Sequence, residues 1–382
     1  MAICASLAAP LLKITHHDSF GIHFWGRSTT GKTTAARMAN SVWGPVNEIR
    51  TWRTTINGAE GMASLRKDAL LCLDEIDQTN GTVVNEAVYL LANGTGKARA
   101  MFDGSLRPTQ NWRTVIMSTG EKTVLEKLAE YGVQAQAGQS VRLIDIPADA
   151  EKGMGIFEEL HGHQSPALFA TELRNAVETH YGYPSRHFCT YLAENLERLN
   201  AELPTQITEK GLEFLPQGSG QVLRVAQIFA LCAIAGNLGV DSGLLPWSHD
   251  EVHHAVNACF TDWQLERGSL EDMEASALAE RVSGLLEEKG NSLFPDIDQA
   301  EYVYSRRAGV KVMKKDKALY YCLPGYFKGT LCRGTSTRQA CKILYEAGML
   351  LKNSTATGYQ TRLPKTVRGL GRPNCYVLQL PE

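Results

Sequence analysis

The stretch Gly26-Arg-Ser-Thr-Thr-Gly-Lys-Thr-Thr34 decides the fold of this chain. The apolar run 21–25 precedes it, and the segment 35–41, which is rich in helix formers, follows it. A strand, a glycine-bounded loop and a helix in this order are the context that a phosphate-binding loop requires. The sequence therefore predicts such a loop, and not a chance match in a glycine-rich turn.

The residues of this loop have distinct expected roles. Gly26 and Gly31 let the backbone turn its N–H groups toward phosphates at a helix N-terminus. Lys32 can reach the β- and γ-phosphates, and the Thr33 hydroxyl can ligate Mg²⁺. We expect bound ATP to contact Gly26, Thr29, Thr30, Gly31, Lys32, Thr33 and Thr34.

A second motif is expected at the end of a buried strand. Residues 68–75 read Asp-Ala-Leu-Leu-Cys-Leu-Asp-Glu, an apolar run of the length of a buried parallel strand that ends in two carboxylates. Asp74 would hold the Mg²⁺ through water, and Glu75 would polarise the attacking water. Because the pair follows a phosphate-binding loop along the chain, it predicts a nucleoside triphosphatase.

Strand-like and helix-like segments alternate up to about residue 150. This repetition predicts a parallel sheet with helices on its faces, which is an α/β fold. Ser118 or Thr119 closes one of the later strands, where a polar side chain can orient water together with Glu75. Arg142 starts the last strand and is expected to act as an arginine finger on a neighbouring subunit's nucleotide. An ion-paired surface arginine is the alternative.

A basic hairpin is expected between two of these elements. Within residues 97–107, Asp103-Gly104 separates short alternating runs and is a strong hairpin signal, because both residues tolerate positive φ. Its cations can grip the phosphates of single-stranded DNA without reading the sequence. These cations are Lys97, Arg99 and Arg107. A solvated surface hairpin is the alternative.

Helices dominate from residue 151, and a composition break follows near residue 270. Segments 165–181, 184–200 and 218–236 have helical patterns, and the last is apolar with Arg224 on its first turns. Burial of that arginine without an anion would be costly, so a phosphate contact is expected, with a plain salt bridge as the alternative.

The C-terminal part reads as a helix, short strands, a second helix and a basic two-stranded ribbon. This is a winged-helix-like order, and it predicts either duplex DNA binding or docking of subunits. Its basic residues are Arg338, Lys342, Lys365, Arg368 and Arg372. The expected domains are an ATPase core over 1–150, a helical lid over 151–270 and a winged-helix-like domain over 275–382.

Composition sets the class of protein. The chain has 382 residues, 43% of them hydrophobic and 21% charged, and this predicts a globular protein of two or three domains. With a net charge of −2 the chain as a whole does not attract nucleic acid, so any nucleic acid would bind at local patches of basic residues. Nine cysteines without Cys-x-x-Cys spacing predict free thiols in a reducing cytoplasm. No signal peptide or membrane span is expected.

These motifs resemble AAA+ ATPases, and more narrowly the family known as domain of unknown function nine-two-seven, which occurs at the C-terminal end of primase–helicases of phages, plasmids and cassettes. The resemblance covers roughly residues 5–270. It rests on segments 23–34, 41–44, 72–75, 118–121, 141–147, 226–236 and 263–268.

The resemblance implies a homo-hexameric ring related to superfamily-three and minichromosome-maintenance helicases. In such rings a hairpin before the first sensor strand moves DNA through the pore. Many AAA+ proteins carry asparagine at the first sensor position, where Ser118 or Thr119 stands here. No priming half is recognised, so a separate primase or initiator is expected as a partner. We therefore expect a helicase-like ATPase for replication of a mobile element. The alternative is a non-translocating, ATP-switched DNA-binding or assembly factor.

Overall fold

The computed structural model divides the chain into two compact units, Met1–Leu270 and Glu271–Glu382. The residues that it describes are 1–102, 105, 106, 108–133, 137–267, 273–298, 308–314, 317–333, 335–352, 358–368 and 370–380. Each unit has a hydrophobic core of its own.

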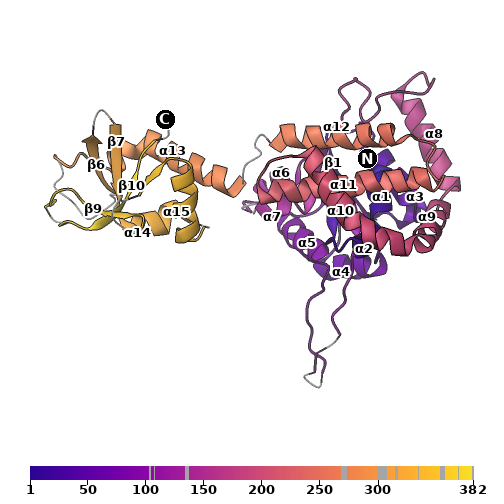
Figure 1. Ribbon diagram of the computed structural model, residues 1–382, viewed down its shortest axis with the longest axis horizontal. Coiled ribbons are helices and arrows are strands. Elements are labelled where there is room, and N and C mark those ends of the chain that lie inside the picture. The colour runs from indigo at the N-terminus through magenta and orange to yellow at the C-terminus, as the bar shows by residue number, and fades with distance from the viewer. Residues whose placement is uncertain are drawn as a thin grey trace. The chain divides into compact units, whose positions relative to one another are not determined.

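A five-stranded parallel sheet forms the centre of the first unit (Figure 1). Its strands lie in the order β2-β3-β4-β1-β5, and every neighbouring pair is parallel. The strands are β1 (Phe20–Trp25), β2 (Arg50–Thr51), β3 (Leu70–Asp74), β4 (Val115–Gly120) and β5 (Leu143–Pro147). The predicted α/β fold with a parallel sheet is therefore confirmed, and it is consistent with a P-loop-like NTPase.

Helices cover both faces of this sheet. One face packs Ile22, Cys72 and Met117 against α1, α3 and α11. The opposite face packs Leu71 and Ile116 against α4, α5 and α6. The helices up to residue 140 are α1 (Ala2–Ala8), α2 (Leu11–Ile14), α3 (Lys32–Ser41), α4 (Ile56–Leu65), α5 (Gly81–Asn93), α6 (Val124–Ala129) and α7 (Ala137–Ser140), with 3₁₀ turns at Val46–Glu48 and Ile76–Gln78. Because successive side chains of a strand point to opposite faces of the sheet, adjacent polar residues on one strand lie in different environments.

Five helices follow the sheet in the same unit. They are α8 (Pro166–Thr179), α9 (Tyr183–Glu194), α10 (Leu196–Phe214), α11 (Gly220–Asp241) and α12 (His249–Arg267). Within the described residues, α11 is the one helix long and apolar enough to cross a membrane, but 78% of its apolar window is buried inside the protein. It packs against α1, α10 and α12, so we interpret it as a core helix.

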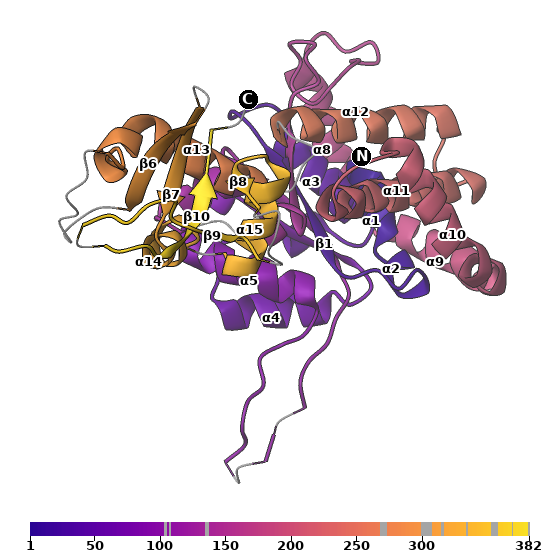
Figure 2. The ribbon, with the colours of Figure 1, turned by 60° about the vertical axis from the view of Figure 1, so that its left-hand side comes forward.

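A long hairpin leaves the end of α5 and returns to β4. Its two sides are joined by backbone hydrogen bonds, from Gly96 N to Gln110 O (2.8 Å) and from Met101 N to Ser105 O (2.7 Å). Figures 1 and 2 show it projecting well beyond α4. The predicted hairpin is therefore present, although Asp103, Gly104 and Arg107 lie outside the described residues.

The second unit is built on an antiparallel sheet. The strand order is β6-β7-β10-β8, and β9 also pairs with β10. Its elements are α13 (Met273–Leu293), β6 (Gly309–Lys314), β7 (Lys317–Cys322), α14 (Pro324–Tyr326), a π-helical turn (Phe327–Leu331), α15 (Thr337–Glu346), β8 (Leu350–Leu351), β9 (Gln360–Arg362) and β10 (Asn374–Leu378). The expected helix–helix–ribbon order is present in α13, α15, β9 and β10, whereas β6 was not predicted. The strand predicted at 301–305 lies outside the described residues, and the winged-helix assignment stays a prediction.

Candidate nucleotide site

The glycine-bounded loop joins β1 to α3, as the sequence predicts. Gly31 is the N-cap residue of α3 and has φ +102°, while Gly26 has φ +145°. A Cβ atom on Gly31 would lie 2.8 Å from Cγ1 of Ile156, whose N–H donates to Thr30 O at 2.9 Å. Glycine is therefore required at residue 31 by backbone conformation and by close packing. In this part of the chain no side chain caps α3, so the N–H groups of its first turn face the loop without a side-chain acceptor.

Lys32 lies inside this loop. Its Nζ donates to Gly26 O at 2.7 Å and to Arg27 O at 2.6 Å, and only 9% of the residue is exposed. Burial lowers the pKa of the ammonium group, and the nearby carboxylates of Glu121, Asp77 and Asp74 oppose that shift. The cation is thus held against two carbonyl oxygens of the loop, and its predicted contact with nucleotide phosphates stays a prediction.

The carboxyl ends of β3 and β4 bring the acidic motif beside Thr119. The Thr119 hydroxyl donates to the Asp74 carboxylate and accepts a hydrogen bond from the Glu75 N–H at 3.2 Å. Because β4 lies between β1 and β3, Thr119 stands between the strand that enters the loop and the strand that ends in Asp74. Of the two residues left open by the sequence, Thr119 is the one that contacts the acidic pair.

Glu75 has an unusual backbone conformation. Its φ is +61°, in the left-handed region that residues other than glycine seldom adopt. Its side chain is exposed, and Gln78 Nε2 donates to its carboxylate. Residues held in such conformations cluster at functional sites, and Glu75 is exposed directly after the end of β3.

Ser118 takes part in a separate buried network on the opposite face of the sheet. Trp52 Nε1 donates to Ser118 Oγ at 2.8 Å, and Ser118 Oγ lies 2.7 Å from His23 Nδ1. His23 Nε2 lies 2.9 Å from Lys122 O. A carbonyl only accepts, so the proton is assigned to Nε2, and Nδ1 then accepts from the Ser118 hydroxyl. Although the sequence places His23 in a buried strand, it gives no sign of these partners.

His23 predicts a specific acid sensitivity. Burial lowers its pKa from 6.5 to about 4, with the Lys122 carbonyl opposing the shift. The unfolded state therefore binds more protons than the folded state between these values. We expect this group to reduce the unfolding free energy by about 3 kcal/mol as the pH falls from about 6.5 to about 4. Urea unfolding at several pH values, with the native protein and with His23→Asn, measures the difference.

Asp145 supplies the control for that measurement, because its effect has the opposite sign. It is the register partner of His23 on β5, and burial raises its pKa from 3.8 to about 7. Its stabilising contribution is complete below pH 3.8 and is lost as the pH rises through about 7. Asp145→Asn should therefore lose more stability on acidification than the native protein. Identical pH profiles for native protein and His23→Asn would contradict the assignment to His23.

Arg142 lies at the other edge of the sheet from the phosphate loop. Strands β1 and β5 are parallel, with Gly21 opposite Leu143 and Trp25 opposite Pro147. The loop follows Trp25, whereas Arg142 precedes Leu143, so about five residues of strand at ~3.3 Å each separate the two levels. Its Nη1 donates to Gly138 O at 2.9 Å and its guanidinium lies 5.0 Å from the Tyr89 ring centroid. Among the described residues it has no carboxylate partner.

The expectation that Arg224 is buried was wrong. It lies on the first turns of α11, but its side chain is on the exposed side of that helix. The expectation came from the length and apolar composition of this helix. The helix buries its other sides and leaves the side that carries Arg224 open to solvent. The cost of burial therefore gives no reason for a phosphate there, and the contact remains a prediction without that support.

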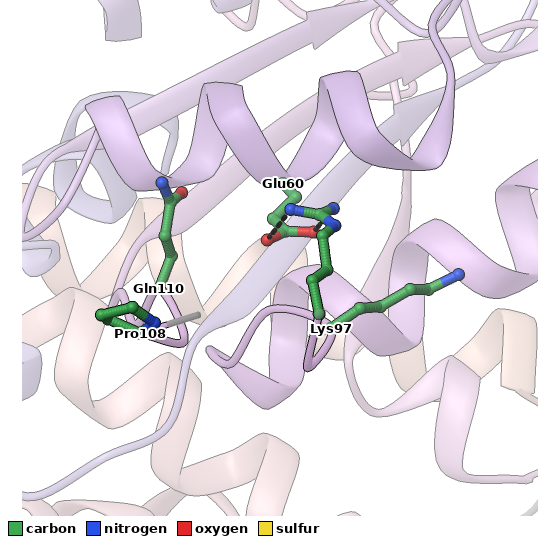
Figure 3. A pocket seen from close by; sticks show the side chains of 5 residues that line it. Glu60, Lys97, Pro108 and Gln110 are labelled. Carbon is green, nitrogen blue, oxygen red and sulfur yellow. Dashed lines mark hydrogen bonds and ion pairs between the residues drawn. The ribbon is translucent and has the colours of Figure 1, made fainter. Parts of the chain in front are cut away.

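The cations at the base of the hairpin are paired with carboxylates. Lys97 forms an ion pair with Glu86, and both side chains are about half exposed. Arg99 Nη2 lies 2.6 Å from Glu60 Oε2, and its Nη1 donates to Glu60 Oε1 at 3.2 Å. Glu60, Lys97 and Gln110 line a pocket at the hairpin base (Figure 3). Nearer the tip, three of the exposed side chains are large and apolar, namely Met101, Phe102 and Leu106.

Comparison with known proteins gives a family match and a solved structure of similar fold. Residues 1–111 match the family described as Domain of unknown function (DUF927), which confirms the expected resemblance to that family. A comparison with curated proteins gives no match. Among solved structures, one described as "SCCmec type IV Cch - active helicase" is similar, with a TM-score of 0.68 and 20% sequence identity. The similarity covers 100% of this chain and 66% of the other, so this chain spans less than two thirds of that protein. At this identity the likeness shows the fold.

Proposed function

We propose that the chain is an AAA+ ATPase that translocates DNA and acts as a helicase in the replication of a phage, plasmid or integrated mobile element. The observation that carries this proposal is the convergence of Lys32, Asp74 and Thr119 at one edge of a parallel sheet. The projecting hairpin and the likeness in fold to a protein described as an active helicase support it.

We propose that the site at the start of α3 binds ATP together with Mg²⁺. The uncapped first turn of α3 and the buried ammonium of Lys32 suit phosphate oxygens, and Thr33 and Asp74 offer the oxygen ligands that Mg²⁺ prefers. No cluster of three metal-ligating side chains occurs among the described residues. None is needed, since Mg²⁺ at such sites takes one or two protein ligands together with substrate phosphates and water. The bound cation neutralises charge on those phosphates.

The residues of this chain would divide the remaining work. Glu75 would accept a proton from the attacking water, and Thr119 would hold Glu75 and Asp74 in place. Lys32 would stabilise the charge that develops on the transferred phosphoryl group. Arg142 would do the same for the nucleotide of a neighbouring subunit in a homo-hexamer. Arg224 remains a proposed nucleotide contact.

The partners in this proposal are nucleic acids and replication proteins. The hairpin would contact single-stranded DNA in the pore of the ring, and the 275–382 domain would bind duplex DNA. Arg338 and Lys342 are exposed on α15, whereas Lys365 pairs with Asp298. A separate primase or initiator would supply primers. Nine free cysteines fit a reducing cytoplasm, where we place the protein.

Steady-state ATP hydrolysis with and without single-stranded DNA tests the proposal. We expect stimulation that weakens as salt rises, because phosphate contacts release counterions. Stimulation should be lost in Lys97→Ala/Arg107→Ala, which leaves the Arg99 pair intact. Lys210→Ala is the matched control, since Lys210 is a paired lysine on α10, away from the hairpin in the sequence. Equal rates with and without DNA would contradict a motor and favour the ATP-switched DNA-binding or assembly factor.

A further inference from the structure

Glu60 is a buried carboxylate whose cationic partner comes from the hairpin. It lies on α4, and its side chain is 3% exposed. The Arg99 guanidinium engages both of its oxygens, and Arg99 Nη2 also donates to Asn57 Oδ1 at 2.9 Å. The dashed lines at Glu60 in Figure 3 mark these contacts of its carboxylate. A fork of this kind fixes the direction of the hairpin as well as its distance from α4.

The packing at this point leaves little freedom. A Cβ atom on Gly96 would lie 2.4 Å from Glu60 Oε1, so the first side of the hairpin lies directly against the carboxylate. A buried carboxylate deprived of its cation is strongly unfavourable, which ties the position of Arg99 to that of α4. The Lys97–Glu86 pair differs, because both of its side chains are about half exposed and such pairs contribute little.

The start of α4, which carries Asn57 and Glu60, is connected to the candidate nucleotide site. Thr55 caps the helix by accepting from Gly58 N at 3.1 Å, and Trp52 precedes it closely. The Trp52 N–H donates to Asp74 O at 3.0 Å, and its indole N–H donates to Ser118. Trp52 is therefore bonded to the ends of both strands that carry the acidic residue and Thr119. Hydrogen bonds through Trp52 therefore link those strand ends to the segment that leads into α4.

We propose that Glu60, Asn57 and Arg99 form a joint that fixes the hairpin to α4 and couples it to the strand ends at Asp74 and Thr119. Glu60 is then a positioning residue for DNA-stimulated hydrolysis, and Arg99 anchors the hairpin instead of gripping DNA. The proposal rests on the proposed function in that the hairpin contacts DNA.

Glu60→Gln tests the joint, with Glu86→Gln as the matched control. The glutamine keeps the shape of the side chain but removes the charge that holds Arg99. We expect basal hydrolysis to stay unchanged and DNA stimulation to fall about fivefold or more, within the range of coupling between sites. The affinity for a fluorescent single-stranded oligonucleotide should change less than about twofold, because the tip still reaches DNA. Glu86→Gln releases the exposed Lys97 but leaves the Glu60 contacts intact, so it should leave basal hydrolysis and DNA stimulation unchanged. Asn57→Ala, an exposed and milder change, should act in the same direction as Glu60→Gln.

If DNA stimulates the native protein, two results would overturn the joint. Tighter oligonucleotide binding by Glu60→Gln would make Arg99 a phosphate ligand restrained by Glu60, and unchanged stimulation in both Glu60→Gln and Asn57→Ala would remove the coupling. If DNA fails to stimulate the native protein, the proposed function fails. Amide hydrogen exchange then tests whether the contacts of Glu60 hold the hairpin against α4. Exchange of the Gly96 and Trp112 amides, which bond across the hairpin base, should be faster in Glu60→Gln than in Glu86→Gln. Equal exchange would overturn the joint.

Discussion

Replacing Glu75 by glutamine should lower ATP hydrolysis about 10²–10⁴-fold and leave nucleotide binding intact, as expected for loss of a general base. The amide has the same shape as the carboxylate but cannot accept the proton. Glu75 is exposed at the carboxyl edge of the sheet, and its backbone is tied to Thr119 by a 3.2 Å hydrogen bond. Binding of a fluorescent ATP analogue and steady-state hydrolysis separate the two effects.

Glu121 is the control for this prediction, because it is a second carboxylate at the same edge. Its charge acts on the Lys32 ammonium, and its N–H donates to Asp77 Oδ2 at 2.5 Å. Glu121→Gln should reduce hydrolysis far less than Glu75→Gln. A larger loss in Glu121→Gln would transfer the role of general base to that residue. Loss of nucleotide binding in Glu75→Gln would instead show a structural role.

The sheet and its glycine-bounded loop were predictable because their signals are local. A strand, a glycine loop and a helix follow one another in the sequence, and an apolar run that ends in Asp74-Glu75 needs no distant partner to be identified. Alternation along β4 also explains why Thr119 and Ser118, although adjacent, face different sides of the sheet. The sequence left that choice open, because it does not show which face α3 covers.

The hairpin illustrates what sequence alone could not supply. Asp103-Gly104 predicts its turn, which lies outside the described residues, and its basic residues indicate phosphate binding. The partner of Arg99 is on α4, far earlier in the chain, and a charge pattern does not identify distant partners. The exposure of Arg224 was missed for a related reason, since apolar composition predicts that a helix is buried but not which of its sides remains open.

Arg142→Ala should reduce ATP hydrolysis by about 10³-fold or more if it is an arginine finger. The parallel register places it at the amino edge of the sheet, remote from the phosphate loop of its own subunit. A finger at this position would therefore act on the nucleotide of a neighbouring subunit. Its side chain contacts a carbonyl and an aromatic ring, and in the described part of the chain it has no ion pair that would need to be broken.

Mixing two inactive variants distinguishes this role from a structural one. Lys32→Ala lacks a working loop but keeps Arg142, and Arg142→Ala keeps the loop but lacks the finger. When the two are mixed, some interfaces join an intact loop to an intact Arg142, so activity should rise above that of either variant alone. Arg113→Ala, which changes an arginine before β4 at the same sheet edge, should stay active by itself. If the mixture stays inactive while mixed assemblies form, Arg142 does not act across an interface, because each such assembly contains the complementary pair.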